Sequence, residues 1–192
     1  MGREFELKFR ATPAQQDAIL QGFGDFSPIS METTYYDTPG RSLSARRITL
    51  RRRLENGISV CTLKTPGVGY SRGEWNMEEA EIAAAIPVLC KLSGVLELPT
   101  WSQEGLSPLC AARFTRQRKT LSFPEFTAEL ALDRGVLLGA GREMPLYELE
   151  LELISGSETA LVEYAKKLAA QYGLEPESHS KFRRAMALAT GE

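Results

Sequence analysis

Apolar and polar residues alternate along residues 1–10, and this pattern predicts a β-strand. Successive side chains of a strand point to opposite faces, so Glu4, Glu6 and Lys8 share one face, while the other face is apolar. A strand with one apolar face on a core and one polar face in water is ordinary. Two carboxylates and an ammonium group in a row are also what a site for a metal-bound polyphosphate requires.

The same alternation predicts further strands, mostly joined in hairpins. Asn56-Gly57 is a strong hairpin signal, and Asp133-Arg134-Gly135 is expected to form a turn. The expected strands cover residues 1–10, 30–38, 48–54, 58–64, 70–79, 113–120, 123–133, 136–138 and 144–154. Helices are expected at residues 12–21, at 81–92 with an interruption at Pro87, at 157–172 and at 181–189, whereas 93–108 is expected to be rich in loops.

About eight strands with helices at the ends of the chain indicate an α+β fold, built on a large antiparallel sheet or a closed barrel. The 192 residues suit one domain, and no internal repeat or linker indicates a second one. The chain is 43% hydrophobic and 25% charged, which is typical of a soluble globular protein with a real core.

Composition argues against several classes of protein. The net charge of −2 gives no bulk electrostatic case for nucleic acid or a membrane surface. No apolar run approaches the roughly 20 residues of a membrane span, and the N-terminus has no signal-peptide pattern. Three cysteines without metal-type spacing favour a reducing cytoplasm. The single histidine, His179, argues against a multi-histidine zinc site and a Ser-His-Asp triad.

The polar faces of six predicted strands are charged, with one sign over short runs. Glu148, Glu150 and Glu152 share one face, where neighbouring side chains lie about 6.5–7 Å apart and repel one another. A shared divalent cation would relieve this repulsion. The other charged faces carry Thr49, Arg51 and Arg53; Thr62 and Lys64; Arg72, Glu74, Asn76 and Glu78; Arg116 and Arg118; and Glu125, Thr127, Glu129 and Asp133.

Arginine and lysine faces complement the acidic ones, because guanidinium groups bind phosphate oxygens through two hydrogen bonds. A solvated face explains any one of these strands taken alone. Repetition of the pattern in six strands argues against a plain solvated face. If the sheet closes, its charged faces point into one polar lumen and its apolar faces are covered by helices.

Several motifs follow one another in a recognisable order. They are Glu4-Phe5-Glu6-Leu7-Lys8 (E-x-E-x-K), Tyr35-Tyr36-Asp37-Thr38-Pro39, Leu50-Arg51-Arg52-Arg53, Thr62-Leu63-Lys64, Arg72-Gly73-Glu74, Glu148 to Glu152 followed by Ser155-Gly156, and Ser180-Lys181. This set resembles the CYTH domains, also called triphosphate tunnel metalloenzymes, over almost the whole chain, as one domain at residues 1–192. The likeness is greatest to the CYTH portion of bacterial inorganic triphosphatases, which is often fused to a helical phosphate-binding CHAD domain.

The resemblance implies an eight-stranded antiparallel closed β-barrel, or tunnel, with helices packed outside. The residues implied as ligands of Mg²⁺ or Mn²⁺ are Glu4, Glu6, Glu148, Glu150 and Glu152, and which two of the last three bind the metal stays open. Glu129 and Asp133 match an acidic pair that positions metal or the attacking water, and Lys8 is a further catalytic candidate. The implied triphosphate-binding residues are Lys8, Arg51, Arg53, Lys64, Arg72, Arg116, Arg118 and Lys181.

The implied activity is metal-dependent hydrolysis of inorganic triphosphate to pyrophosphate and phosphate. The alternatives are an adenylate cyclase, or a thiamine or nucleoside triphosphatase, of the same family, and a polyphosphate-binding module without turnover. An RNA 5′-triphosphate end is disfavoured by the acidic net charge. The expected partners are a small molecule that contains a triphosphate and a fused or separate CHAD domain, but no membrane.

Overall fold

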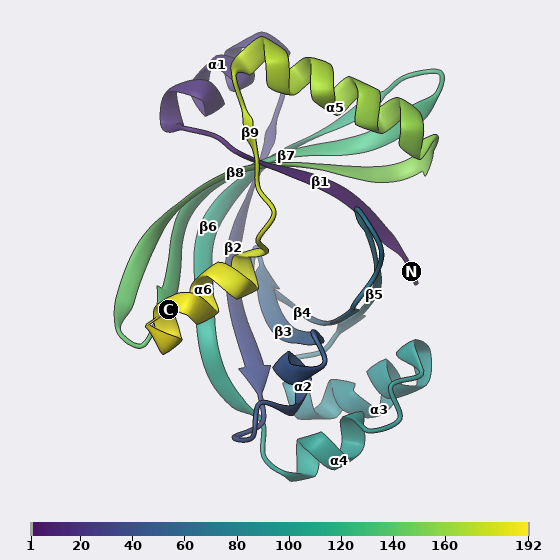
Figure 1. The fold of residues 1–192 in the computed structure, drawn as a ribbon, viewed down its shortest axis with the longest axis vertical. Coiled ribbons are helices and arrows are strands. Elements are labelled where there is room, and N and C mark those ends of the chain that lie inside the picture. The colour runs from purple at the N-terminus through teal and green to yellow at the C-terminus, as the bar shows by residue number, and fades with distance from the viewer. Residues whose placement is uncertain (1, 192) are drawn as a thin grey trace.

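Eight antiparallel strands close into a barrel in the computed structural model, which describes residues 2–191 (Figure 1). The sheet runs in the order β5-β4-β3-β2-β6-β7-β8-β1, and the pairing of β1 with β5 closes it. The strands are β1 (Glu4–Arg10), β2 (Ser27–Asp37), β3 (Thr49–Glu55), β4 (Ile58–Thr65), β5 (Ser71–Glu78), β6 (Ser107–Ser122), β7 (Phe126–Gly139) and β8 (Arg142–Gly156). A two-residue strand, β9 (Glu175–Pro176), adds to β1. The predicted α+β fold with a closed eight-stranded barrel is confirmed.

The seam between β1 and β5 is short. Only Glu4 and Phe5 of β1 pair with β5, opposite Arg72 and Ser71. From Glu6 onward β1 pairs with β8 instead. The E-x-E-x-K motif therefore lies between the glutamate-rich strand β8 and the start of β5.

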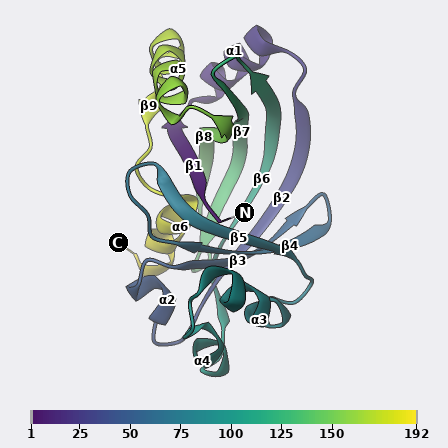
Figure 2. The same cartoon turned by 90° about the vertical axis from the view of Figure 1, so that its right-hand side faces the viewer.

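Five helices cover the outside of the barrel in two groups (Figures 1 and 2). The helices α1 (Pro13–Phe23) and α5 (Glu158–Tyr172) pack on the apolar outer faces of β1, β7 and β8. The other group, α2 (Ser42–Ala45), α3 (Ile82–Ser93) and α4 (Leu98–Gln103), covers β3, β4 and β5. Among the described residues, no helix is long and apolar enough to cross a membrane.

The last helix, α6 (Lys181–Thr190), packs differently from the other five. Its Phe182 and Ala185 contact residues on the concave side of the sheet, among them Ala112 of β6, Leu137 of β7 and Leu146 of β8. The first residues of α6 consequently reach the lumen of the barrel, where they line its cavity.

The predicted turn at residues 133–135 is wrong, because β7 runs through it without a break. Gly135 allows β7 to approach β6 closely and does not form a turn. A Cβ atom at this position would lie 2.1 Å from the carbonyl oxygen of Arg113 on β6. A glycine in a strand interior can mark such an approach, and the sequence alone does not separate this use from a turn.

The expected interruption at Pro87 is also wrong, because α3 continues through it. A proline removes one backbone donor from a helix, and burial of the apolar face that includes Ala85, Ile86 and Leu89 offsets this loss. The region 93–108, expected to be loop, contains α4, and the short α2 was not predicted at all. Both are short helices of one or two turns, for which hydrophobic periodicity gives little signal.

Candidate functional site

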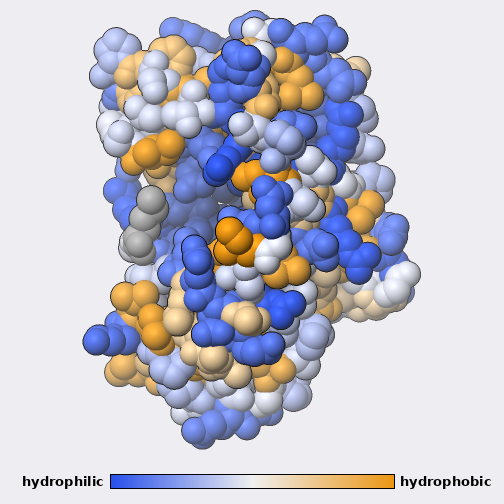
Figure 3. Space-filling model, turned by 180° about the vertical axis from the view of Figure 1, so that it is seen from behind, coloured by the Kyte–Doolittle hydropathy of each residue, from blue (hydrophilic) through white to orange (hydrophobic). Residues whose placement is uncertain are grey.

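The barrel encloses a charged cavity of about 380 Å³, a volume within the usual range of small-ligand sites. Eight basic and seven acidic side chains line it. From behind, the molecule shows a hollow with hydrophilic side chains in its centre (Figure 3). The lining includes all eight residues predicted to bind phosphate: Lys8, Arg51, Arg53, Lys64, Arg72, Arg116, Arg118 and Lys181.

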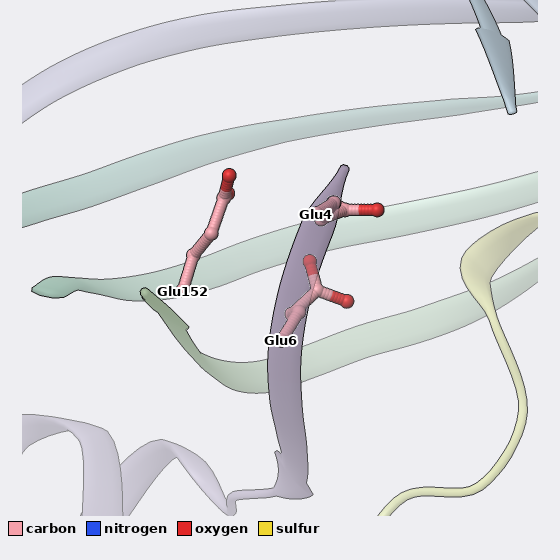
Figure 4. Close-up of side chains that lie close together, drawn as sticks. All are labelled: Glu4, Glu6 and Glu152. Atoms are coloured by element: carbon pink, nitrogen blue, oxygen red, sulfur yellow. The ribbon is translucent and has the colours of Figure 1, made fainter. Parts of the chain in front are cut away.

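Three glutamates form an acidic triad at the β1–β8 boundary: Glu4, Glu6 and Glu152. One carboxylate oxygen from each lies within 4.8 Å of those of the other two. Figure 4 shows the three side chains extending from these neighbouring strands into the same space. Glu6 and Glu152 are cross-strand partners, so the register of the barrel itself brings these two carboxylates together.

Two members of the triad have cationic partners, and the third has none. Glu4 accepts a hydrogen bond from Lys64 Nζ at 2.8 Å and another from Arg72. Glu6 forms an ion pair with Lys8 at 3.4 Å. Among the described residues, Glu152 has neither a hydrogen bond nor an ion pair through its side chain. Burial and the negative charges of Glu4 and Glu6 raise its pKa to about 8.

The donor set of the acidic triad fits a hard divalent cation. Mg²⁺ and Mn²⁺ prefer oxygen ligands, and Mg²⁺ is usually held by a few carboxylates together with substrate phosphates. The carboxylate of Glu152 is unpaired and faces two others, which is the arrangement that a shared cation would stabilise. Of the two acidic clusters in the described chain, this is the one that a metal suits.

The opposite part of the cavity gathers guanidinium groups that are only partly neutralised. Arg53 is buried, and its nearest carboxylate oxygen, on Glu55, lies 3.5 Å away. Burial and the neighbouring Arg51 and Arg116 lower the pKa of Arg53 to about 10. The Nε atom of Arg51 is buried without a hydrogen-bond partner. Crowded cations of this kind bind anions, because a polyanion would remove their mutual repulsion.

A second acidic cluster is already neutralised by cations. It joins three carboxylates with three basic side chains, Asp133, Glu148 and Glu150 with Arg116, Lys181 and Arg184. Arg116 donates to both carboxylate oxygens of Asp133 at 2.8 Å, and Lys181 Nζ lies 2.6 Å from Glu150. This buried network fastens α6 to β6, β7 and β8.

The structure divides the predicted acidic residues into two groups. Those that line the cavity are Glu4, Glu6, Glu129, Glu150 and Glu152. Asp133 and Glu148 are fully buried behind the lining, within the network that holds α6. Of the three glutamates between which the sequence did not decide, Glu152 therefore has the free carboxylate, and Glu148 and Glu150 are paired with cations.

Sequence reasoning missed Arg184 and did not assign a role to Glu74. Arg184 follows Lys181 by three residues, so helical spacing puts both on one face of α6, and this was the available signal. Glu74 forms an ion pair with Lys64 at 2.6 Å. Although burial opposes ionisation, Lys64 and Arg51 hold the pKa of Glu74 well below its usual range.

The motif at residues 35–39 organises the loop before β3. The buried carboxylate of Asp37 accepts hydrogen bonds from the backbone N–H groups of Thr38 at 2.8 Å and of Leu43 and Ser44 at 3.0 Å. Tyr35 lines the cavity. Asp37 thus fixes the short helix α2 and, through it, the start of β3, which carries the arginines of the site.

The chain is similar to known proteins over nearly its whole length. The family model of the CYTH domain matches residues 2–186. An inorganic triphosphatase of Haemophilus influenzae is 28% identical over 197 residues, which cover 98% of this chain and 55% of that protein. The chain therefore spans about half the length of this curated relative.

Two solved structures share the fold. A Bacillus halodurans protein provisionally named an adenylate cyclase has a TM-score of 0.67 and 20% identity, over 96% of this chain and 98% of its own. A Hippeastrum protein provisionally named an adenylyl cyclase, for which a dominant triphosphatase activity is described, has a TM-score of 0.64 and 18% identity. It covers 100% of this chain and 97% of its own.

Proposed function

The chain belongs to the CYTH domain family, and from this we propose that it hydrolyses inorganic triphosphate to pyrophosphate and phosphate with a divalent metal ion. One observation carries the proposal. An acidic triad with an unpaired carboxylate shares one cavity with guanidinium groups that lack full counter-charge. The named activity of the Haemophilus influenzae relative, an inorganic triphosphatase, supports the choice of reaction.

The cations of the cavity would bind and align the substrate. Phosphoryl transfer asks mainly for positioning and for stabilisation of charge on the phosphate oxygens. Arg51, Arg53 and Lys64 project from neighbouring strands into the cavity, so they can contact successive phosphate groups of one chain. In the resting protein Lys64 is held by Glu4 and Glu74, and this positions its ammonium group before the substrate arrives.

Glu4, Glu6 and Glu152 would hold Mg²⁺ or Mn²⁺. A metal bound there would supply a Lewis acid for phosphate oxygens and would lower the pKa of a coordinated water. Binding of the metal requires Glu152 to be ionised. Because the pKa of Glu152 is raised, its carboxyl group must lose a proton when the metal binds.

Glu129 would accept the proton of the attacking water. It lines the cavity and is the cross-strand partner of Glu152. Burial raises its pKa although Arg116 and Arg118 lie nearby, which brings it closer to that of a useful general base. Water would attack a terminal phosphorus, the bond to the bridging oxygen would break, pyrophosphate would leave, and the proton would pass to Glu129.

The aromatic residues of the lining favour an inorganic substrate over a nucleotide. Among the described residues around the cavity, they are Tyr35 and Phe182 alone. Their rings pack on each other with centroids 5.2 Å apart, and Tyr35 is only 3% exposed. Tyr35 therefore offers no free face on which an adenine or thiamine ring would stack, and the ring of Phe182 already packs against Tyr35.

The test is phosphate release from tripolyphosphate, ATP and thiamine triphosphate, each with Mg²⁺, with Mn²⁺ and with a chelator. We expect metal-dependent turnover with tripolyphosphate preferred. Equal or faster turnover of ATP, or cyclic AMP as a product, would contradict the proposed substrate. Tight binding of tripolyphosphate without any turnover would identify a binding module instead.

A further inference from the structure

Two further cavities border the central one, share lining residues with it and differ in charge. The first, called here the basic mouth, has a volume of about 790 Å³ and contains Lys8, Arg47, Lys64, Arg72 and Lys166 against two acids, Glu6 and Glu177. The second, the mixed mouth, has a volume of about 500 Å³ and contains two acids and two bases, Asp25, Glu129, Arg118 and Lys119.

The two mouths lie at opposite ends of the strands. The basic mouth includes Thr49, the first residue of β3, whereas the mixed mouth includes Ser27, the first residue of β2. Because β2 and β3 are antiparallel neighbours, their first residues lie at opposite ends of the barrel. A polyanion approaching the protein is therefore attracted to one end more than to the other.

Arg47 differs from the other cations of the basic mouth. Lys8, Lys64 and Arg72 are paired with glutamates of the cavity, and Lys166 is paired with a glutamate of its own helix. Within residues 2–191, no ion pair or hydrogen bond engages the side chain of Arg47, which is exposed. Arg47 is thus the one basic residue of this mouth whose charge is free for a ligand.

The backbone of Arg47 is held in a conformation that arginine does not favour. Its φ angle is 56°, in the left-handed region, which is sterically unfavourable for a residue with a Cβ atom. Two backbone bonds enforce it, from Arg47 N–H to Ser44 O at 2.9 Å and from Ile48 N–H to Leu43 O at 3.0 Å. Glycine adopts this conformation without steric strain, so the presence of an arginine here indicates that its side chain has a function.

We propose that Arg47 is a substrate-binding residue that captures the triphosphate at the basic mouth, and that the substrate reaches the cavity through this opening. The inference rests on the proposed function. The polyanion binds first to the free guanidinium group of Arg47. It then passes to the cations that line both the basic mouth and the central cavity, Lys8, Lys64 and Arg72.

The test compares the kinetics of tripolyphosphate hydrolysis by wild type, Arg47→Gly, Arg47→Lys and Arg46→Ala. Arg47→Gly removes the charge and keeps the backbone conformation, so it should melt no lower than wild type. We expect its KM to rise about three- to fivefold with kcat unchanged, since an exposed charge contact contributes up to about 1 kcal/mol. The difference should shrink in about 1 M salt, where the screening length falls to about 3 Å.

Arg47→Lys should retain a KM close to that of wild type. Arg46→Ala is the matched control, because it removes an equal charge one residue away. The Arg46 guanidinium lies 4.8 Å from the centroid of the Trp101 ring, outside both mouths, so this variant should behave as wild type. A wild-type KM for Arg47→Gly, or an equal rise in KM for Arg46→Ala, would overturn the assignment.

Failure of the proposed function is distinguishable from failure of this inference. If the wild type does not hydrolyse tripolyphosphate, the proposed function is wrong, and calorimetric binding of tripolyphosphate to wild type and Arg47→Gly replaces the kinetic test. Weaker binding by Arg47→Gly than by Arg46→Ala then supports capture at Arg47, and equal binding overturns it.

Discussion

Replacing Glu152 with glutamine should stabilise the metal-free protein at pH 8. An acid whose pKa is higher in the folded than in the unfolded chain favours folding when protonated and opposes it when ionised. For Glu152 the stability contribution is therefore complete below its ordinary pKa of 4.5 and is lost as the pH rises toward about 8. Glutamine is uncharged at every pH and avoids this loss.

The magnitude follows from the raised pKa of Glu152. One pKa unit corresponds to about 1.4 kcal/mol, so the loss at pH 8 is on the order of 2–4 kcal/mol after a reduction for water in the cavity. For a protein of 192 residues this corresponds to an increase in Tm of about 5–10 °C for Glu152→Gln in chelator at pH 8. At pH 5 the two proteins should melt within a few degrees of each other.

Excess metal should cancel most of this difference in Tm between the two proteins. Excess Mn²⁺ stabilises a protein that binds it by RT ln(1 + [L]/Kd), about 2.7 kcal/mol at a hundredfold excess over Kd. Wild type should show this increase in Tm, and Glu152→Gln should lose most of it. Thermal melting at pH 5 and pH 8, with chelator and with Mn²⁺, measures all four combinations.

Glu4→Gln is the matched control for Glu152→Gln. It makes the same chemical change in the same triad, but it removes the carboxylate that pairs with Lys64 and Arg72, so it should lower Tm in chelator. An equal Mn²⁺ shift in wild type and Glu152→Gln would refute the view that Glu152 is a ligand. A lower Tm of Glu152→Gln than of wild type in chelator at pH 8 would refute the electrostatic account.

Three further predictions concern the cations and the strand β7. Arg53→Ala should lower kcat/KM for tripolyphosphate about 10- to 100-fold, since a charge-assisted hydrogen bond contributes about 1.5–3 kcal/mol. Arg52→Ala should match wild type in the same kinetics, because the Arg52 guanidinium donates to a backbone carbonyl outside the cavity at 3.0 Å. Lys181→Met should destabilise the protein by about 3–5 kcal/mol in urea denaturation, because three buried carboxylates would keep only two cations; an unchanged denaturation midpoint would contradict this role. Gly135→Ala should lower Tm, because its Cβ atom would overlap the backbone of β6, and a wild-type Tm would restore the interpretation of this segment as a turn.

Much of the barrel could be predicted from the sequence because each strand alternates between a charged and an apolar face. This period fixes which side chains turn inward, and β3 shows it plainly. Arg51 and Arg53 line the cavity, while Arg52 between them donates to the carbonyl of Ala80 outside. The closure of the barrel came from the family resemblance, since a sheet of the same period can stay open.

The pairing of charges inside the lumen could not be predicted, because it depends on register and on the position of α6. Glu148, Glu150 and Glu152 look alike in sequence, with the same spacing and the same face. Only the folded chain shows that Lys181 and the other cations of its network reach the first two and leave Glu152 unpaired. Gly135 shows the same limit, since its contact on β6 is 22 residues away in the sequence.

The central claim is tested most directly by following the products of tripolyphosphate with ³¹P NMR, in the presence of Mg²⁺ and again with excess chelator. We expect pyrophosphate and phosphate to appear in equal amounts with metal, and neither to form with chelator. We also expect Glu152→Gln, shown to be folded by its melting curve, to leave tripolyphosphate intact. Unchanged tripolyphosphate in the wild-type reaction, or equal hydrolysis with and without metal, would contradict the central claim.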